Sequence, residues 1–158
     1  PKGNVLIIVA ENRPRPNQFK LNQSPHLVNS TSPLAGVKSC NYLENLMAYE
    51  EARARNFVEA VRLNERGHIT SGCMANVFWE AGGKLFTPCP STGCLPGTTR
   101  EFVIENLECE EVKAAIEVLE SADRIFLSSA GLGVARVAGF NGPLLDNSEH
   151  IISKLFPS

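Results

Sequence analysis

Near the middle of the chain, residues 76–87 read NVFWEAGGKLFT, the strongest hairpin pattern of the sequence. Asn76–Glu80 and Lys84–Thr87 are rich in apolar and aromatic residues, and they flank Gly82-Gly83, a two-residue signal for a tight hairpin turn. Because hairpins alternate with helical segments along the rest of the chain, the sequence predicts an α+β domain and not a doubly wound α/β sheet.

Further strands are expected before and after this hairpin in the chain. The polar residues 18–37 include two prolines, and they are expected to form an extended loop or an edge strand. Turns are expected at residues 64–67 and at Asn141-Gly142. The predicted strands are Val5–Ala10, Ala60–Leu63, one that begins at Ile69, Arg124–Ser128 and Val134–Ala138.

Four segments have helical patterns. The first begins after Asn41, with Glu44 completing a capping box, and stops near Asn56, a residue that tolerates the left-handed conformation. A second helix starts at Thr98, with Glu101 as its reciprocal cap. The remaining helices are predicted within Glu111–Ala122, at least in its second half, and at Ser148–Phe156.

Composition limits the class of protein. The chain has 158 residues, 15 basic and 17 acidic, for a formal net charge of −2, which argues against a dedicated nucleic-acid binder. No apolar run is long enough to form a transmembrane helix, so no membrane partner is expected. Five cysteines in no zinc-like spacing indicate free thiols in a reducing cytoplasm, and no metal site is predicted.

Three loops could carry chemistry. Lys38 precedes a helix N-terminus, where the helix dipole disfavours a cation and favours a neutral, nucleophilic amine, although a solvated surface lysine would look the same. Residues 94–100 read CLPGTTR, which supplies either a phosphate cradle or an ordinary helix start. Residues 128–133 read SSAGLG, and their small side chains and backbone amides could supply further contacts to a phosphate. A lysine and an anion cradle together suggest pyridoxal phosphate.

With these motifs, residues 30–140 resemble the class IV (branched-chain-type) aminotransferase family. The resemblance rests on KSCNYLENL at 38–46, NERGHITSGC at 64–73, ANVFW at 75–79, KLFTP at 84–88 and LPGTTR at 95–100. Within the family, it is nearest to the aminodeoxychorismate lyases and D-amino-acid transaminases. The resemblance implies the large C-terminal domain of the D-amino-acid-aminotransferase-like fold, in which β-hairpins pack with helices.

The resemblance also implies roles for particular residues. Lys38 would hold the cofactor as a Schiff base and later move the substrate's α-proton. Leu95, Gly97, Thr98 and Thr99 would line the ring and bind the phosphate. Ser129 and Ala130 would contact the phosphate from the other loop, although branched-chain enzymes typically carry threonine at the position of Ala130.

Ser71 is the larger departure from the family pattern. The family typically places a glutamate there, whose carboxylate keeps the pyridine nitrogen protonated. A serine hydroxyl cannot hold that proton by charge, so transamination should suffer more than an elimination. The resemblance therefore implies a lyase that eliminates pyruvate through Lys38. A transaminase of D- or branched-chain amino acids is the close alternative, and a non-catalytic relative with a weakened electron sink is the more distant one.

Nothing in the chain corresponds to the family's smaller N-terminal domain. We therefore expect residues 1–20 to be the end of that domain or the interdomain crossover, and 21–158 to be the cofactor-binding large domain. By resemblance alone, a cytoplasmic homodimer is expected, because the family's active sites lie near a dimer interface.

Overall fold

The computed structural model describes residues 7–9, 16, 18–146 and 148–156. Its elements follow the order of the chain and mix strands with short helices. They are β1 (Phe19–Gln23), α1 (Leu43–Ala54), β2 (Glu59–Leu63), β3 (Ile69–Gly72), β4 (Asn76–Ala81), β5 (Lys84–Pro88), the 3-10 helix η1 (Pro90–Thr92), α2 (Thr98–Asn106), β6 (Cys109–Val112), α3 (Glu117–Glu120), β7 (Arg124–Ser129), β8 (Gly133–Phe140) and α4 (Ile151–Lys154).

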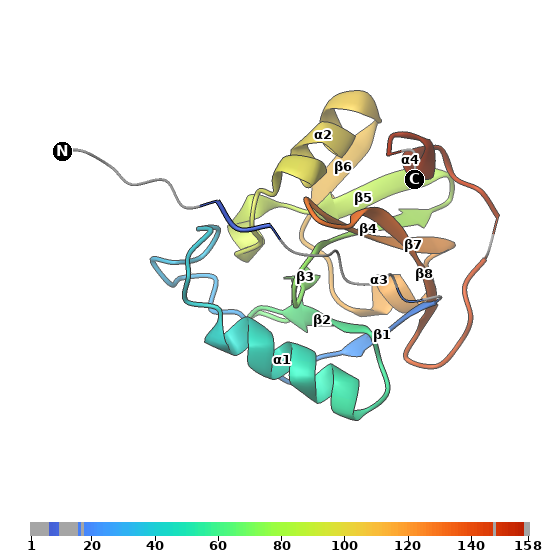
Figure 1. Ribbon diagram of the computed structural model, residues 1–158. Helices are drawn as coiled ribbons and strands as arrows, with labels where there is room; N and C mark the ends of the chain where they lie inside the picture. The colour runs from blue at the N-terminus through green and yellow to red at the C-terminus, as the bar shows by residue number, and fades with distance from the viewer. Residues whose placement is uncertain (1–6, 10–15, 17, 147, 157–158) are drawn as a thin grey trace.

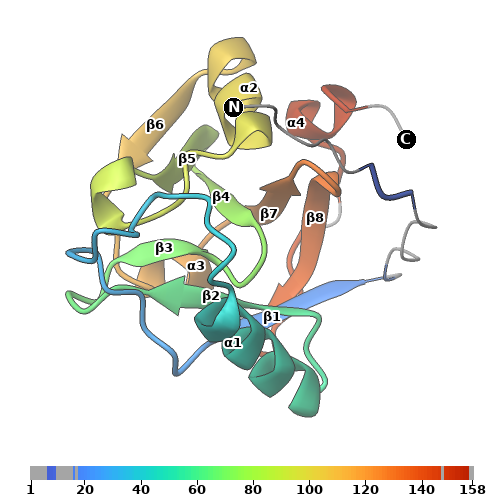
Figure 2. The same cartoon turned by 60° about the vertical axis from the view of Figure 1, so that its left-hand side comes forward.

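The strands form one curled sheet of eight in the order β3-β2-β1-β8-β7-β4-β5-β6. Most neighbouring pairs are antiparallel, but β1 runs parallel to both β2 and β8, and β5 runs parallel to β6. Helix α1 packs against β2, whereas α2 packs against β7 and α4 against β8, away from α1 (Figures 1 and 2). This mixed sheet with helices confirms the α+β prediction.

The central hairpin forms as predicted. β4 and β5 pair from Trp79 opposite Phe86 to Ala81 opposite Lys84. Gly82 and Gly83 both have positive φ, 57° and 76°, which is the conformation that a type I′ turn requires. Trp79 and Phe86 stack with ring centroids 5.8 Å apart, so this cross-strand pair buries aromatic area in the core.

β1 corrects the expectation of a loop or edge strand for residues 18–37. It lies in the interior of the sheet, paired on both sides, with Leu21 fully buried. Its sequence, FKLNQ, has only two apolar residues, Phe19 and Leu21, and lacks the continuous apolar run of a strand in the interior of a sheet. Its position is therefore decided by the neighbouring strands β2 and β8, whose pairing groups it satisfies.

The predicted strand Val5–Ala10 fails where it can be followed. Ile7–Val9 form no strand, and their side chains are between 79% and 91% exposed. Val5, Leu6 and Ala10 lie outside the described residues, as does most of the polar stretch that follows. An apolar run becomes a strand only when another strand pairs with it, and no described strand does so here.

Both predicted helix caps are wrong, although the helices exist. The N-cap of α1 is Tyr42 and that of α2 is Gly97, and neither helix has a side-chain cap hydrogen bond. Glu101 pairs with the Arg100 guanidinium instead of reaching back to the helix start. Asn56, with φ of 64°, does end α1 in the left-handed conformation.

Two later helical predictions hold only in part. Residues 111–122 contain α3 in their second half, as predicted, whereas Glu111 and Val112 at their start belong to β6. Here pairing with β5 overrides the helical pattern, from Leu85 opposite Cys109 to Pro88 opposite Val112. The C-terminal helix is limited to α4, shorter than the predicted Ser148–Phe156.

The core divides into three clusters. The largest gathers Leu21, Val61, Val77, Ile125, Leu127 and other side chains on one face of the sheet. A second joins α2 and α4 to the sheet through Val103, Phe126 and Ile152. The third packs Ala48 and Ala52 of α1 on Ala60 and Cys73. None of the helices in the described part of the chain is long and apolar enough to cross a membrane.

Candidate active site

The eight residues named from the sequence line one cavity of about 520 Å³. They come from four segments that are far apart in the chain: the loop before α1, the end of β3, the start of α2 and the β7–β8 turn. These residues are Lys38, Ser71, Leu95, Gly97, Thr98, Thr99, Ser129 and Ala130. A cavity of this size suits a small-molecule cofactor or substrate.

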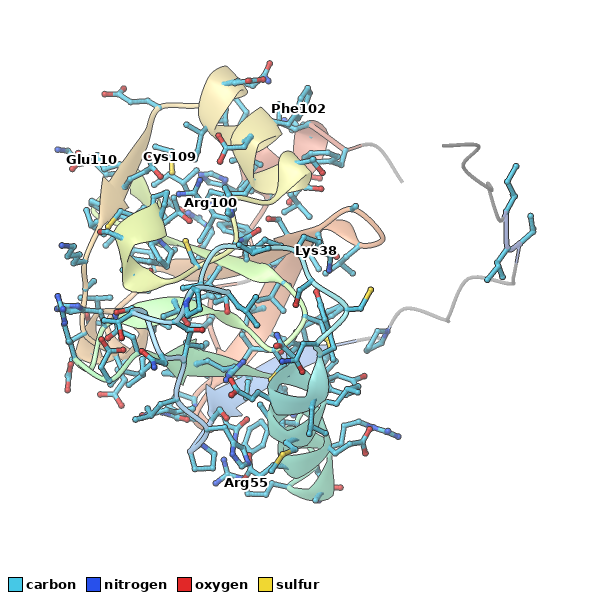
Figure 3. All side chains as sticks on the ribbon, turned by 90° about the vertical axis from the view of Figure 1, so that its left-hand side faces the viewer. Lys38, Arg55, Arg100, Phe102, Cys109 and Glu110 are labelled. Carbon is cyan, nitrogen blue, oxygen red and sulfur yellow. The ribbon has the colours of Figure 1, made fainter. Side chains whose placement is uncertain are left out.

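Lys38 projects into this space from the loop before α1 (Figure 3). Its Nζ donates a hydrogen bond to the Tyr42 hydroxyl and lies 4.3 Å from the centroid of the Tyr42 ring. Tyr42 also lines the cavity, so it holds the amine in place by a hydrogen bond and a cation–π contact. Tyr42 is not among the residues predicted from the sequence, although its spacing of four residues from Lys38 is a signal that the sequence carries.

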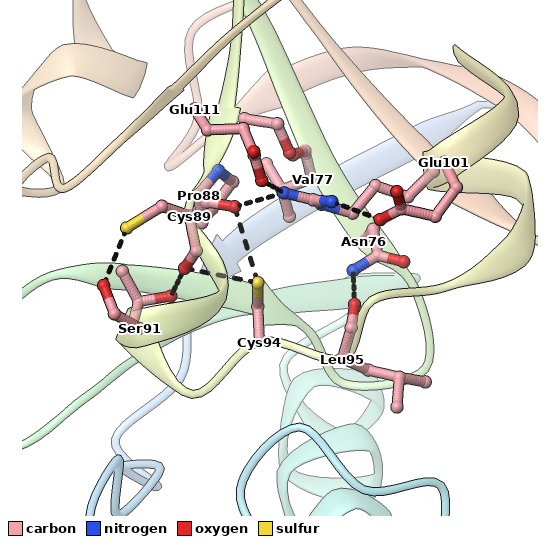
Figure 4. A network of polar contacts seen from close by, with 12 residues as sticks. Asn76, Val77, Pro88, Cys89, Ser91, Cys94, Leu95, Glu101 and Glu111 are labelled. Carbon is pink, nitrogen blue, oxygen red and sulfur yellow. Dashed lines mark hydrogen bonds and ion pairs between the residues drawn. The ribbon is translucent and has the colours of Figure 1, made fainter. Parts of the chain in front are cut away.

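The start of α2 presents backbone amides to the same cavity. Gly97 is the N-cap, and no side chain caps the helix, so the first-turn amides beside Thr98 and Thr99 are not used by a cap. Asn76 Nδ2 donates to the Leu95 carbonyl oxygen at 2.7 Å and holds this segment against β4 (Figure 4). A Cβ on Gly97 would lie 2.4 Å from Asn76 Oδ1, so the segment requires glycine there.

The buried Arg100 side chain holds the first turn of α2 in place. Its side chain is 1% exposed, and its guanidinium pairs with Glu101 and Glu111 and donates to the Pro88 carbonyl oxygen. Figure 4 shows these acceptors arranged around one buried group. The charge is therefore compensated within the protein, and Arg100 fixes the helix without lining the cavity.

The turn between β7 and β8 closes another side of the cavity. Ser129 Oγ accepts from the Leu132 amide at 3.2 Å, which shapes the turn, and Ala130 and Gly131 follow at the cavity surface. Ser128 also lines the cavity, and its buried hydroxyl oxygen has no hydrogen-bond partner in the described structure. A bound ligand would supply the missing partner for a buried hydroxyl.

The β3–β4 connection, residues 72–75, forms a further wall. Glu59 holds it from β2: its carboxylate accepts the amides of Cys73 and Met74, each at 2.7 Å. Burial raises the pKa of Glu59, and the amide hydrogen bonds oppose that shift. Asn45 of α1 donates to the Cys73 carbonyl oxygen at 2.6 Å from the other side. Glu59 and Asn45 were not predicted from the sequence, because only the fold places them beside the β3–β4 connection.

Comparisons with known proteins agree with this arrangement. The family model described as "Amino-transferase class IV" matches residues 1–140. Among curated proteins, the aminodeoxychorismate lyase of Bacillus subtilis (strain 168) is 36% identical over 103 residues, which are 62% of this chain and 35% of that protein. The branched-chain-amino-acid aminotransferase of Escherichia coli (strain K12) is 32% identical over 118 residues, 72% of this chain and 38% of that protein. The chain thus spans well under half the length of these relatives.

Solved structures show the same likeness in three dimensions. A branched-chain aminotransferase from Thermoproteus uzoniensis, solved with norvaline, superposes with a TM-score of 0.82 at 28% identity, covering 87% of this chain and 48% of that one. A putative 4-amino-4-deoxychorismate lyase from Legionella pneumophila superposes with a TM-score of 0.81 at 28% identity, covering 95% of this chain and 56% of that one. Because the family model matches residues 1–140, most of the sequence, the chain belongs to the class IV aminotransferases.

Proposed function

We propose that this chain is the cofactor-binding part of a pyridoxal-phosphate-dependent enzyme of class IV that acts as a lyase and eliminates pyruvate from an aminodeoxychorismate-like substrate. The observation that carries the proposal is the meeting of Lys38 and the uncapped start of α2 in one cavity. An aldehyde and a phosphate on one small molecule match these two features.

The residues present fit this cofactor. The unused amides and the Thr98 and Thr99 hydroxyls suit a phosphate, and the partnerless Ser128 hydroxyl offers one more polar contact. Leu95, Gly97, Ser71, Ser129 and Ala130 would surround the ring and phosphate. When bound, the cofactor withdraws electrons from the substrate's α-carbon and so acidifies the α-proton.

Lys38 has two tasks in this proposal. Its Nζ would bind the cofactor's aldehyde, and after the substrate displaces it, the free amine would take the α-proton. The Tyr42 hydroxyl, which accepts a hydrogen bond from Nζ, would keep the amine over the cavity during that exchange. Because nothing but Lys38 supplies an amine to this cavity within the described structure, no other residue can replace it in both tasks.

Ser71 supports the lyase over the transaminase. It lines the cavity without a carboxylate, so it can offer only a hydroxyl to a ring nitrogen. A transaminase of D- or branched-chain amino acids is the second candidate, favoured by the likeness to the branched-chain enzymes. Pyruvate release from an aminodeoxychorismate-like substrate would support the lyase, whereas exchange of amino groups between amino and keto acids would support the transaminase.

The remaining parts of the proposal concern the whole protein. We propose that residues up to about 20 lead from a smaller N-terminal domain into the large domain, that the enzyme is a homodimer, and that it works in the cytoplasm. The five cysteines are all free thiols, which suits a reducing compartment.

The experiment that tests the proposal is mass spectrometry after borohydride reduction with pyridoxal phosphate. We expect one pyridoxyl group on a peptide containing Lys38, because among the described residues only that amine faces the cavity. Lys38→Ala should abolish the label, while Lys84→Ala, which removes an exposed lysine paired with Glu110, should leave it unchanged. Labelling spread over several surface lysines, with none favoured, would refute the cofactor site.

A further inference from the structure

A second, smaller cavity of about 250 Å³ adjoins the first. The two share several lining residues, among them Lys38, Tyr42 and Ser71. The loop before α1 covers the smaller cavity, and β2 contributes Arg62 to its lining. Anything bound there would therefore lie directly beside the Lys38 amine.

Arg62 is a buried cation with little compensation. Its side chain is 3% exposed, and Nε and Nη2 donate to the carbonyl oxygens of His26 and Leu27 at 3.1 and 2.9 Å. The nearest carboxylate is that of Glu44, 3.6 Å from Nη2, which is too far for a hydrogen bond, and the Glu44 side chain is 77% exposed. Such an exposed partner compensates a buried charge weakly.

Two other arginines of the described chain, one buried and one partly buried, differ in this respect. Arg100 pairs with two carboxylates, Glu101 and Glu111. Arg124, 18% exposed, pairs with Glu80 and Asp146. A buried charge without a close partner of opposite charge costs free energy. Such a charge is therefore expected where a ligand or a counter-ion neutralises it.

Ser71 lies next to this cation. Arg62 and Ser71 are paired across β2 and β3, and side chains paired in this way share one face of the sheet. Both line the smaller cavity. Among the ionisable side chains around that cavity, Lys38 and Arg62 are basic and Glu44 is acidic, so the cavity favours an anion.

We infer that Arg62 binds a carboxylate of the substrate in the smaller cavity, beside Lys38. The inference rests on the proposed function for the identity of the ligand as a substrate. The cofactor phosphate is assigned elsewhere because Thr98 and Thr99 line only the larger cavity and Arg62 lines only the smaller one. A guanidinium can offer a carboxylate two parallel hydrogen bonds. Nε and one hydrogen of Nη2 are used by the His26 and Leu27 carbonyl oxygens, which leaves Nη1 and the second hydrogen of Nη2 for the ligand.

The test measures binding of propionate to the cofactor-free chain by calorimetry, with propionamide as the neutral probe of the same shape. We expect propionate but not propionamide to bind, and Arg62→Gln to weaken propionate binding by about tenfold or more, as for loss of a charge-assisted hydrogen bond. Arg66→Gln changes an exposed arginine four residues away and should leave binding unchanged.

Three further variants separate binding from a structural role. Arg62→Lys keeps the charge and should retain part of the propionate affinity. Glu44→Gln removes the one carboxylate of the described residues that lies within 4 Å of the Arg62 guanidinium, and should leave affinity equal or raise it. Ser71→Glu supplies a resident carboxylate opposite Arg62 and should weaken propionate binding. Thermal melting of each variant identifies any that fail to fold. Equal affinity in wild type and a folded Arg62→Gln or Arg62→Lys variant, or no propionate binding by wild type, would overturn the inference.

A last arm repeats the propionate titration with saturating pyridoxal phosphate. Unchanged affinity supports a separate carboxylate site, whereas competition would assign the anion at Arg62 to the cofactor and overturn it. If pyridoxal phosphate fails to label Lys38 while propionate binds through Arg62, the proposed function fails and the anion site stands.

Discussion

Single residues set the shape of the candidate site through close contacts in which another side chain would not fit. Gly97 is the sharpest case, because a side chain there would collide with Asn76, which itself holds Leu95. Lys38 and Tyr42 are a second case, since one hydroxyl and one ring hold the reactive amine. At this scale, position within a few tenths of an ångström decides binding.

We expect Gly97→Ala to weaken binding of pyridoxal phosphate. The new Cβ would lie 2.4 Å from Asn76 Oδ1, so Asn76 must move and its bond to Leu95 must break. Overpacking of this kind costs about 1–3 kcal/mol of stability. Fluorescence titration with the cofactor and thermal melting would measure both effects.

Gly131→Ala is the matched control for this change. Gly131 also lines the cavity, but a Cβ there would meet nothing within 4 Å. We expect that variant to bind the cofactor like wild type. Equal losses in the two variants would show that the Gly97–Asn76 contact does not set the cavity wall.

At the scale of elements, short connections tie loops to the sheet. The loop before α1 is attached to the β2–β3 turn by Glu65, whose carboxylate accepts the Ser30 amide at 2.9 Å and the Ser30 hydroxyl at 2.7 Å. These bonds lower the pKa of Glu65 from 4.5 to about 2. The same loop lines the smaller cavity through Asn29 and Ser32, so this attachment helps to position the cavity wall.

The depressed pKa of Glu65 predicts how the attachment depends on pH. Because the folded-state pKa lies below the ordinary value, the attachment is complete above pH 4.5 and is lost as the pH falls towards about 2. We expect Ser30→Ala to return the Glu65 pKa towards 4.5. Carboxyl carbon chemical shifts followed by NMR during acid titration would measure it. A Glu65 pKa near 2 in Ser30→Ala would refute the assignment.

At the scale of the whole molecule, three core clusters hold one curled sheet, and an apolar face stays exposed on α1. Leu43, Leu46 and Met47 are 65%, 48% and 50% exposed on that helix, and Leu34 and Val37 are exposed in the loop before it. Contiguous apolar surface of this kind is typical of an interface. It lies next to Lys38, so a partner there would adjoin the candidate site.

We expect the homodimer that we propose to cover this face. Sedimentation should give about twice the 17.2 kDa of the chain, and a Leu46→Asp, Met47→Asp double variant should be monomeric. Leu144→Asp is the control, because Leu144 is 73% exposed and far along the chain from α1. A wild-type monomer, or a double variant that stays dimeric, would contradict the expectation.

Much of the site was predictable from the sequence, since its parts are local motifs. Glycines favour the tight turn of a hairpin and the start of a helix because of their backbone conformation. A lysine before a helix is placed next to the helix dipole. Each of these preferences is carried by a short segment of the chain. The motifs and the family resemblance together pointed to eight residues, and the fold brings the four segments that carry them to one cavity. The predictions of secondary structure that were wrong share one cause. β1, β6 and the starts of α1 and α2 depend on neighbours that are distant in sequence.

The residue pattern alone predicts the α+β class, the hairpin and most of the strands and helices, and the resemblance to a known family adds the residues expected at the cavity. The tertiary structure alone decided that Arg62 lies buried beside Ser71 and Lys38, that Glu59 and Asn45 hold the β3–β4 connection, and that Asn76 supports the start of α2. The physical reason is that burial, charge compensation and hydrogen-bond partners are properties of packed surfaces. A strand segment such as EAVRL carries no local signal for which of its side chains will face an anion.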